Sequence, residues 1–149
     1  MLAANINDLD LTQCGFDGKP EFRVDANWFI HSGTGAQGST IVYFEVPAGH
    51  TCPGHNHTVE ENIFIVEGTA EVTIGTETKT FGKGGLVVIP ALERQVIKNV
   101  GKDTLKVLGF FPSTTVISAF DEVLQGPPTP SRVVVVPEPG DVMTTYPKT

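Results

Sequence analysis

The sequence predicts an all-β domain, an antiparallel sandwich or barrel, and three observations support that prediction. Segments rich in β-branched and aromatic residues recur at intervals of roughly 8 to 12 residues, with turn-forming residues between them. Glycine and proline, 16 and 11 of the 149 residues, are dense enough to favour many short strands over long helices. Hydrophobic residues make up 40% and charged residues 18%, a balance typical of a soluble globular domain.

The first clear strand is expected over 21–33, after about twenty residues that show no regular period. The next, 40–46, consists mainly of β-branched and aromatic residues and ends at Pro47, which has no N–H for a strand ladder. Further strands are expected at 62–68, 69–75, 76–84, 86–90, 94–101 and 103–111, with Gly68, Gly75 and Gly82 as hairpin signals.

One segment departs from this pattern and is predicted to be a short amphipathic helix. Its sequence, TTVISAFDEVLQG (114–126), has a possible N-cap at Thr114 or Thr115 and a glycine just past its end. Its apolar residues recur at offsets of one, four, seven and eight, the spacing of one helix face: Val116, Ile117, Phe120, Val123 and Leu124.

The C-terminal part of the chain, 126–149, is expected to be a proline-rich extended arm. Its four consecutive valines, 133–136, predict an edge strand that pairs with this chain or with another subunit. We expect a single domain over 1–149, with its barrel core at about 40–111.

The stretch GHTCPGHNHTVEE (49–61) carries the residues best suited to chemistry. His55 and His57 are two apart, so on a strand both side chains face the same side, with Cα atoms about 6.6 to 6.8 Å apart. Glu61 is an even number of residues from both histidines, so on an uninterrupted strand it would face the same side. Glu60, the alternative carboxylate ligand, would face the opposite side. Two imidazoles and one carboxylate are the ligands of a facial metal site that leaves coordination positions open.

These residues also carry a resemblance to a known family. Their spacing matches the first sequence motif of the cupins at every fixed position, which are Gly49, His55, His57, Glu61 and Gly68. The second cupin motif is matched at Gly84, Pro90 and Asn99, while Leu92 replaces its central glycine and Gln95 replaces its histidine. The resemblance implies a jelly-roll barrel, that is, an antiparallel double-stranded β-helix.

The replacement of the motif histidine by Gln95 has the largest consequence for the expected metal site. Alternation in ERQVIKN places Gln95 with Ile97 on one face and the charged Arg94 and Lys98 on the other, so Gln95 is expected to point inward. Its amide oxygen would then be a neutral metal ligand, or its NH₂ group would hydrogen-bond a metal-bound water or the substrate. Both possibilities stay open.

The resemblance implies a metal-dependent enzyme that acts on a small organic molecule inside the barrel, with dioxygenase-like chemistry as the leading prediction. Fe(II) is the first choice of cofactor, and Mn, Ni, Cu and Zn are alternatives because these ligands accept all of them. Glu61 would be a ligand or a proton acceptor, and His50 would transfer protons. Phe44, Ile63 and Ile97 are expected to line the substrate pocket.

Two other functions stay open. One is non-oxidative isomerase, lyase or decarboxylase chemistry, and the other is a non-catalytic cupin module that binds a metal or a metabolite.

Charge and composition limit the partners. A net charge of −7 and a pI near 4.9 argue against binding to nucleic acid or to an anionic membrane surface. The N-terminal residues lack the features of a secretory signal, and two cysteines are too few for a disulfide framework, so a cytoplasmic location is expected. The run NIFIVEG is apolar on both faces of the expected strand, so one face should pack against a second sheet or a second subunit. The cupins that the sequence resembles often pair through such sheets, and this resemblance implies a homodimer.

Overall fold

The computed structural model describes residues 1–127 and 129–137. These residues form two short 3₁₀ helices, η1 (Ile6–Asp8) and η2 (Ser32–Thr34), and a series of strands. The strands are β1 (Thr12–Phe16), β2 (Lys19–Ile30), β3 (Thr40–Val46), β4 (Thr51–His57), β5 (Glu61–Glu67), β6 (Ala70–Ile74), β7 (Glu77–Phe81), β8 (Leu86–Ile89), β9 (Gln95–Asn99), β10 (Leu105–Phe111), β11 (Val116–Gln125) and β12 (Ser131–Val136).

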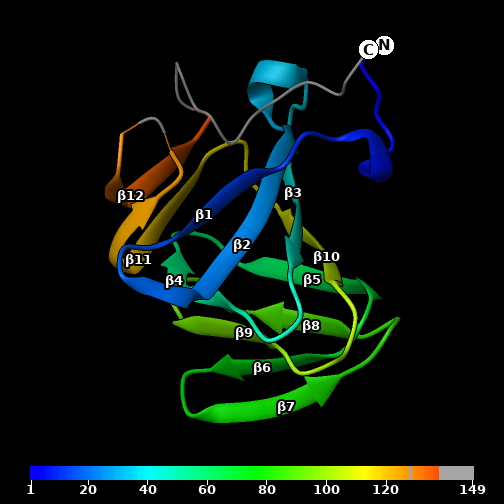
Figure 1. The fold of residues 1–149 in the computed structure, drawn as a ribbon. Helices are drawn as coiled ribbons and strands as arrows, with labels where there is room; N and C mark the ends of the chain where they lie inside the picture. The colour runs from blue at the N-terminus through cyan, green and yellow to red at the C-terminus, as the bar shows by residue number, and fades with distance from the viewer. Residues whose placement is uncertain (128, 138–149) are drawn as a thin grey trace.

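The strands form one continuous sheet that wraps into a jelly-roll barrel. Their order is β7-β6-β9-β4-β11-β1-β2-β3-β10-β5-β8, with β12 paired to β11. These pairings are antiparallel, and a short parallel contact between Phe22 of β2 and Thr51 of β4 brings two distant parts of the sheet together. In Figure 1, β1, β2 and β3 cross the upper half of the molecule and β6, β7 and β9 form its lower end. The predicted all-β barrel is confirmed.

The inward face of each strand follows from simple alternation of buried and exposed residues. In β10, every second residue is buried, and the strand pairs on one side with β3 and on the other with β5. Gly109 therefore lies opposite Val42 and Ile63. Leu105, Val107 and Phe111 fill the core on this face, which is why the segment 103–111 has an apolar residue at each second position.

The predicted helix at 114–126 is wrong, because these residues form strand β11. Its first residues alternate with period two: Val116 and Ser118 are buried, whereas Ile117 is exposed. β11 pairs with β12 through Val116 to Leu124, with β4 through 118–120, and with β1 through 124–125. The register with β12 shifts between Ala119 and Leu124, and this irregularity disturbs the alternation enough to imitate a helical spacing.

The predicted valine strand is confirmed. β12 pairs with β11 of the same chain, with Val134 and Val136 buried and Val133 half exposed. The rest of the expected arm lies partly outside the described residues, at 128 and 138–149.

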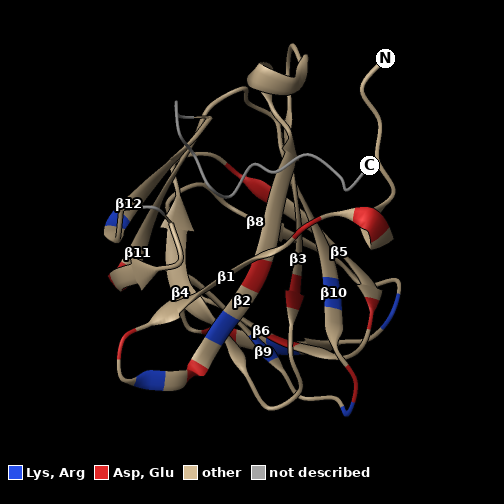
Figure 2. Ribbon diagram, turned by 45° about the horizontal axis from the view of Figure 1, so that its top comes forward, with Lys and Arg blue, Asp and Glu red and all other residues tan. Residues whose placement is uncertain are grey.

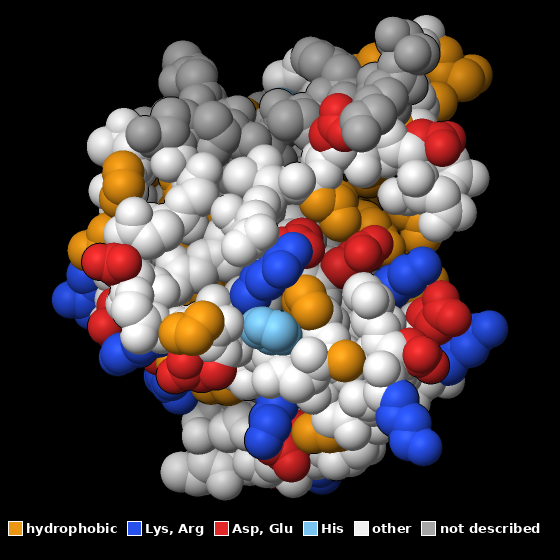
Figure 3. Space-filling model, viewed as in Figure 1, with side chains coloured by type: hydrophobic (Ala, Val, Ile, Leu, Met, Phe, Trp, Pro, Cys, Tyr) orange, Lys and Arg blue, Asp and Glu red, His pale blue; other side chains and the backbone are white. Residues whose placement is uncertain are grey.

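The outer face of the sheet formed by β5, β8 and β10 carries exposed large apolar side chains. Phe64 on β5 lies directly opposite Leu86 on β8, and Val88 and Phe110 flank the same pair of strands. Charged residues of both signs are scattered over the strands and loops in Figure 2, and they interleave on the face shown in Figure 3. None of the helices in the described ranges is long and apolar enough to span a bilayer.

The strand assignment of β11 makes a direct prediction about stability. Leu124 is fully buried and Val123 is largely exposed, although both would face the core of a helix. Leu124→Ala should lower the free energy of unfolding by about 2–5 kcal/mol, because it leaves a cavity in the core. Val123→Ala should cost less than about 1 kcal/mol. Urea denaturation of both variants measures the difference, and equal losses would contradict the strand.

Candidate functional site

Strand β4 carries the two histidines on its inward face. His55 and His57 are both buried, and Asn56 between them faces the other way. The register between β4 and β9 shifts between Cys52 and His55, where Pro53 and Gly54 interrupt the regular strand. This irregularity precedes the histidines, so from His55 onward the alternation is regular and both rings enter the barrel.

Three nitrogen and oxygen atoms meet inside the barrel. His55 Nε2 lies 3.1 Å from His57 Nε2, and His57 Nε2 lies 2.9 Å from Glu61 Oε2. Glu61 is the first residue of β5 and is buried, so the four-residue step from His57 crosses a tight connection between two strands. The structure therefore brings together the three residues that the sequence pattern singles out.

The outer nitrogen of each histidine is held by a specific partner. His55 Nδ1 lies 2.6 Å from the carbonyl oxygen of Pro53, and since a carbonyl only accepts, Nδ1 carries the proton. The neutral ring then presents the lone pair of Nε2 to the barrel interior. His57 Nδ1 lies 2.7 Å from Ser118 Oγ on β11. Outer-shell contacts of this kind fix the tautomer and the orientation of metal-binding histidines.

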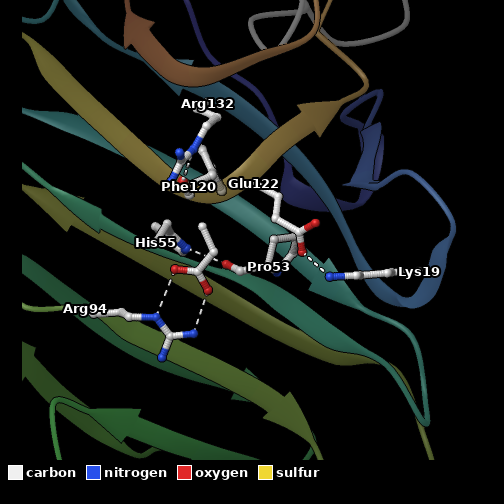
Figure 4. Close-up of polar contacts among 8 residues, drawn as sticks. Lys19, Pro53, His55, Arg94, Phe120, Glu122 and Arg132 are labelled. Atoms are coloured by element: carbon white, nitrogen blue, oxygen red, sulfur yellow. Dashed lines mark hydrogen bonds and ion pairs between the residues drawn. The ribbon is translucent and has the colours of Figure 1, made fainter.

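The surroundings of His55 keep it neutral. Burial lowers the pKa of His55 to about 3, with nearby His57 adding to the effect. Phe120 of β11 stacks on the His55 ring, with centroids 4.9 Å apart. Figure 4 shows His55 with its bond to Pro53 and, beside it, Arg94, which forms two hydrogen bonds to Asp121. The ion pair with Arg94 holds the pKa of Asp121 below its usual range.

Gln95 completes the group from strand β9. It pairs with His55 on β4 and with Ile74 on β6, and its side chain is buried, as the alternation predicts. Neither its amide oxygen nor its amide nitrogen has a hydrogen-bond partner among the described residues. An unsatisfied buried amide costs about 1–3 kcal/mol, so the site is built to give Gln95 a partner that the protein itself does not provide.

The loop before Gln95 is tied to the same histidine strand. Leu92, which stands where the cupin motif has glycine, adopts a left-handed conformation with φ of 67°. A bulky residue rarely adopts this conformation, and here the Leu92 N–H donates to the carbonyl of His57 at 2.8 Å. The backbone requirement of the motif is therefore kept although its glycine is absent.

A cavity of about 40 Å³ lies against these side chains. Its polar lining comes from Cys52, His55, His57, Glu61 and Gln95, and its apolar lining from Val24, Ala26, Trp28, Val42, Phe44 and Phe120. Burial raises the pKa of the Cys52 thiol well above its usual range, with Glu61 adding to the effect, so the thiol is protonated at neutral pH. Glu61 is the only Asp or Glu in this described lining, which contains no Lys or Arg.

Several residues named from the sequence lie elsewhere. Ile63 and Ile97 are buried in the core and do not border this cavity, whereas Phe44 does. His50 precedes β4 at the far end of the strand, where its Nδ1 contacts the carbonyl of Ala48 and its ring borders a separate hollow beside β1. Glu60 is exposed and accepts a hydrogen bond from Asn62.

The sequence reasoning missed Ser118 and the contribution of β2. Ser118 lies in the segment predicted to be helical, so the alternation of a strand was not used to assign its direction. Val24, Ala26 and Trp28 occupy alternate positions of β2, a period-two pattern that could have assigned them to one face but not to this cavity.

The donor set fits a divalent cation. At metal–ligand distances of about 2.1 Å, two ligands at a right angle lie about 3.0 Å apart, and two at a tetrahedral angle about 3.4 Å apart. The observed separations of 3.1 and 2.9 Å match adjacent ligands of an octahedral site. In the described ranges, however, no group of three or more His, Cys, Asp and Glu side chains is arranged so that it could hold a metal ion without movement. His57 instead contacts its two neighbours directly.

Gly109 on β10 provides the space for the Glu61 carboxylate. A Cβ atom at this position would lie 3.1 Å from Glu61 Oε1 and 2.9 Å from Val42 Cγ1. Gly109→Ala should therefore displace Glu61 and lower the free energy of unfolding by about 1–3 kcal/mol, although alanine is the better residue within a strand. Gly38→Ala, whose Cβ would meet nothing within 4 Å, is the control. Equal denaturation midpoints for the two variants would contradict this role.

Comparison with known proteins identifies the fold family. The family model described as a cupin domain matches residues 42–111. The structure is similar to that of the oxalate decarboxylase of Lactobacillus farciminis in a formate complex, with 26% identity over 70% of this chain and a TM-score of 0.60. This chain spans only 32% of that protein.

Two further solved structures share the fold at lower identity. The oxalate decarboxylase of Bacillus subtilis, studied for its Mn(II) centres, is 18% identical over 62% of this chain and 26% of its own, with a TM-score of 0.54. The Cnp3 cupin domain of Schizosaccharomyces pombe is 18% identical over 74% of this chain and 73% of its own, with a TM-score of 0.59. The motif residues, the barrel and these likenesses agree with the match of residues 42–111 to the cupin domain, and the chain has the cupin fold.

Proposed function

We propose that this protein binds a divalent transition-metal cation through His55, His57 and Glu61 and acts as an enzyme on a small organic molecule held in the barrel. The single observation that carries the proposal is the meeting of His55 Nε2, His57 Nε2 and Glu61 Oε2 inside a buried cavity. The tautomer of His55 supports it, because Pro53 holds the proton on the outer nitrogen and leaves the inner one free to bind.

Gln95 supports a site with open positions. An amide is a weaker ligand than the imidazole that usually stands there, and its unsatisfied atoms are free to meet a cation, a water molecule or a substrate. The three stronger donors come from β4 and β5, and a facial set of three donors leaves coordination positions open to an exchangeable ligand. The oxalate decarboxylase with Mn(II) centres supports a divalent cation in a barrel of this kind, and Fe(II) is our first choice.

The protein side chains have distinct tasks in this proposal. Pro53 and Ser118 orient the two imidazoles, and the apolar wall of Val42 and Phe44 excludes bulk water from the cavity. The cation would supply Lewis acidity toward a deprotonated oxygen of the substrate and, for iron, reactivity toward dioxygen. Glu61 is buried without another charged group in the described lining, so it contributes the negative charge that attracts the cation.

Oxygen-dependent chemistry is the leading form of the proposal, because a facial set of two histidines and one carboxylate leaves room for both substrate and dioxygen. A non-oxidative reaction is the second candidate, and the 26% identity with an oxalate decarboxylase favours it. A non-catalytic cupin that binds a metal or a metabolite is the third reading, and it predicts binding without turnover.

The first test is metal retention. Protein purified without added metal should contain close to one transition-metal ion per chain by elemental analysis, and His57→Ala should lose most of it. His50→Ala is the matched control, since this histidine lies outside the cavity and should retain the metal. Equal metal content in both variants, or none in the native protein, would refute the proposed site.

The second test separates the reaction classes. Iron-loaded protein should consume dioxygen in the presence of one of a panel of enolic, phenolic and thiol compounds, and His57→Ala should reduce the rate at least about 100-fold through loss of the cation. The same panel of compounds, together with short carboxylic acids, should be followed under argon with manganese-loaded protein. Turnover under argon, with no consumption of dioxygen in air, would replace oxygenase chemistry by the non-oxidative reaction.

We also propose that the apolar outer face of β5, β8 and β10 joins two copies of the chain. Phe64, Leu86 and Val88 expose large apolar surfaces there, and β8 lies at the end of the sheet order. Sedimentation should show a dimer that Leu86→Glu converts to monomer, whereas Val123→Glu on β11 should leave it dimeric. A monomeric native protein at micromolar concentration would end this part of the proposal.

A further inference from the structure

Trp28 brings an unused hydrogen-bond donor to the cavity. Its side chain is 5% exposed and lines the cavity together with the two histidines and Gln95. The indole Nε1–H is buried and has no acceptor among the described residues. An indole N–H only donates, so no rearrangement of its own protons can satisfy it.

The ring is held in this position by its neighbours. Trp28 stacks on Phe111 with centroids 5.3 Å apart and an interplanar angle of 27°. Its ring also stands edge-on to His57, with centroids 6.5 Å apart. These rings restrict the indole, and an acceptor held in the adjoining cavity would satisfy its N–H.

The charge of the cavity indicates what kind of molecule that is. Among the residues of the described lining, Glu61 is the only carboxylate, and neither lysine nor arginine is present. With a divalent cation bound, the site would carry one net positive charge in a region shielded from solvent. A ligand with a single negative charge would neutralise it, whereas a cationic ligand would be repelled.

The size of the cavity limits the ligand further. Its volume is about 40 Å³, and one water-sized group needs about 10–15 Å³ of such space, so the cavity accepts only about three groups of that size. A compact anion fits this space as it stands, whereas the ring of a phenolic compound from the panel above would require movement of the walls.

We propose, on the basis of the cation site above, that Trp28 is a specificity-determining residue of this protein. Its indole N–H donates a hydrogen bond to one oxygen of a small monoanionic ligand, of the short-chain carboxylate type, that also binds at the His55, His57 and Glu61 centre. The unsatisfied amide of Gln95 provides a second polar contact for the same ligand.

A single indole signal makes the contact measurable. Trp28 is the one tryptophan of the chain, so the zinc-loaded protein labelled with ¹⁵N at the indole gives one indole N–H resonance. Addition of acetate should shift this proton downfield in a saturable manner, and acetamide, its uncharged analogue, should not. If calorimetry shows that acetate binds but the indole signal does not move, the role of Trp28 is overturned. The same conclusion follows if acetate does not bind to the zinc-loaded protein.

Variants test the same contact by affinity. Trp28→Phe keeps an aromatic ring against Phe111 and removes only the donor, and it should weaken acetate binding roughly 10- to 100-fold, the effect of a hydrogen bond to a charged group. Phe44→Leu changes the cavity wall without removing a donor and should change the affinity less than about threefold. Equal losses in the two variants would assign the effect to packing and overturn the proposal.

Metal content separates this inference from the function on which it rests. The zinc stoichiometry of the native protein and of both variants should be equal, because Trp28 and Phe44 are not ligands. Full zinc occupancy with unaltered acetate affinity in Trp28→Phe refutes the role of Trp28 alone. Failure of the native protein to hold zinc refutes the cation site and, with it, this inference.

Discussion

The site depends on the contact between the ring of His55 and the carbonyl of Pro53. This 2.6 Å hydrogen bond fixes a proton on the outer nitrogen, and burial keeps the ring neutral, so the inner nitrogen faces the barrel with a free lone pair. At His57 the outer nitrogen contacts the hydroxyl of Ser118, which can donate or accept, so this contact orients the ring. Without these outer contacts, two buried imidazoles 3.1 Å apart would have no fixed donor and acceptor roles.

The barrel completes the site around the two histidines by bringing β4 between β9 and β11. β9 places Gln95 opposite His55, and β11 supplies Ser118 behind His57 and Phe120 against His55. The polar centre is thus enclosed by strands that are far apart in sequence, and the apolar walls from β2 and β3 close the remaining sides. A low-dielectric enclosure strengthens the attraction between Glu61 and a cation, and it makes each unpaired polar atom in the wall costly.

The cost of leaving these polar atoms unpaired bears on the role of the cavity. The unsatisfied atoms of Gln95 and Trp28 lie in the wall of one small cavity, together with the convergent nitrogen and oxygen atoms. A purely structural core would have replaced them by apolar groups, which pack at no such penalty. The arrangement is therefore best explained by an occupant that completes it, and the proposals on the cation and on the small anion describe two parts of that occupant.

The sequence by itself determined the parts that depend on local alternation. Most of the strands after residue 20 and the inward direction of His55, His57, Glu61 and Gln95 follow from a period of two, which any regular strand imposes. The strand predicted at 133–136 follows from its run of β-branched valines. Only the tertiary structure established that β11 is a strand and not a helix, because a register shift between strand partners imitates a helical period in its sequence. It also decided which inward residues meet: Ile63 and Ile97 share the parity of site residues yet pack in the core, whereas Trp28 and Ser118 reach the cavity through the wrapping of the sheet, which no local pattern encodes.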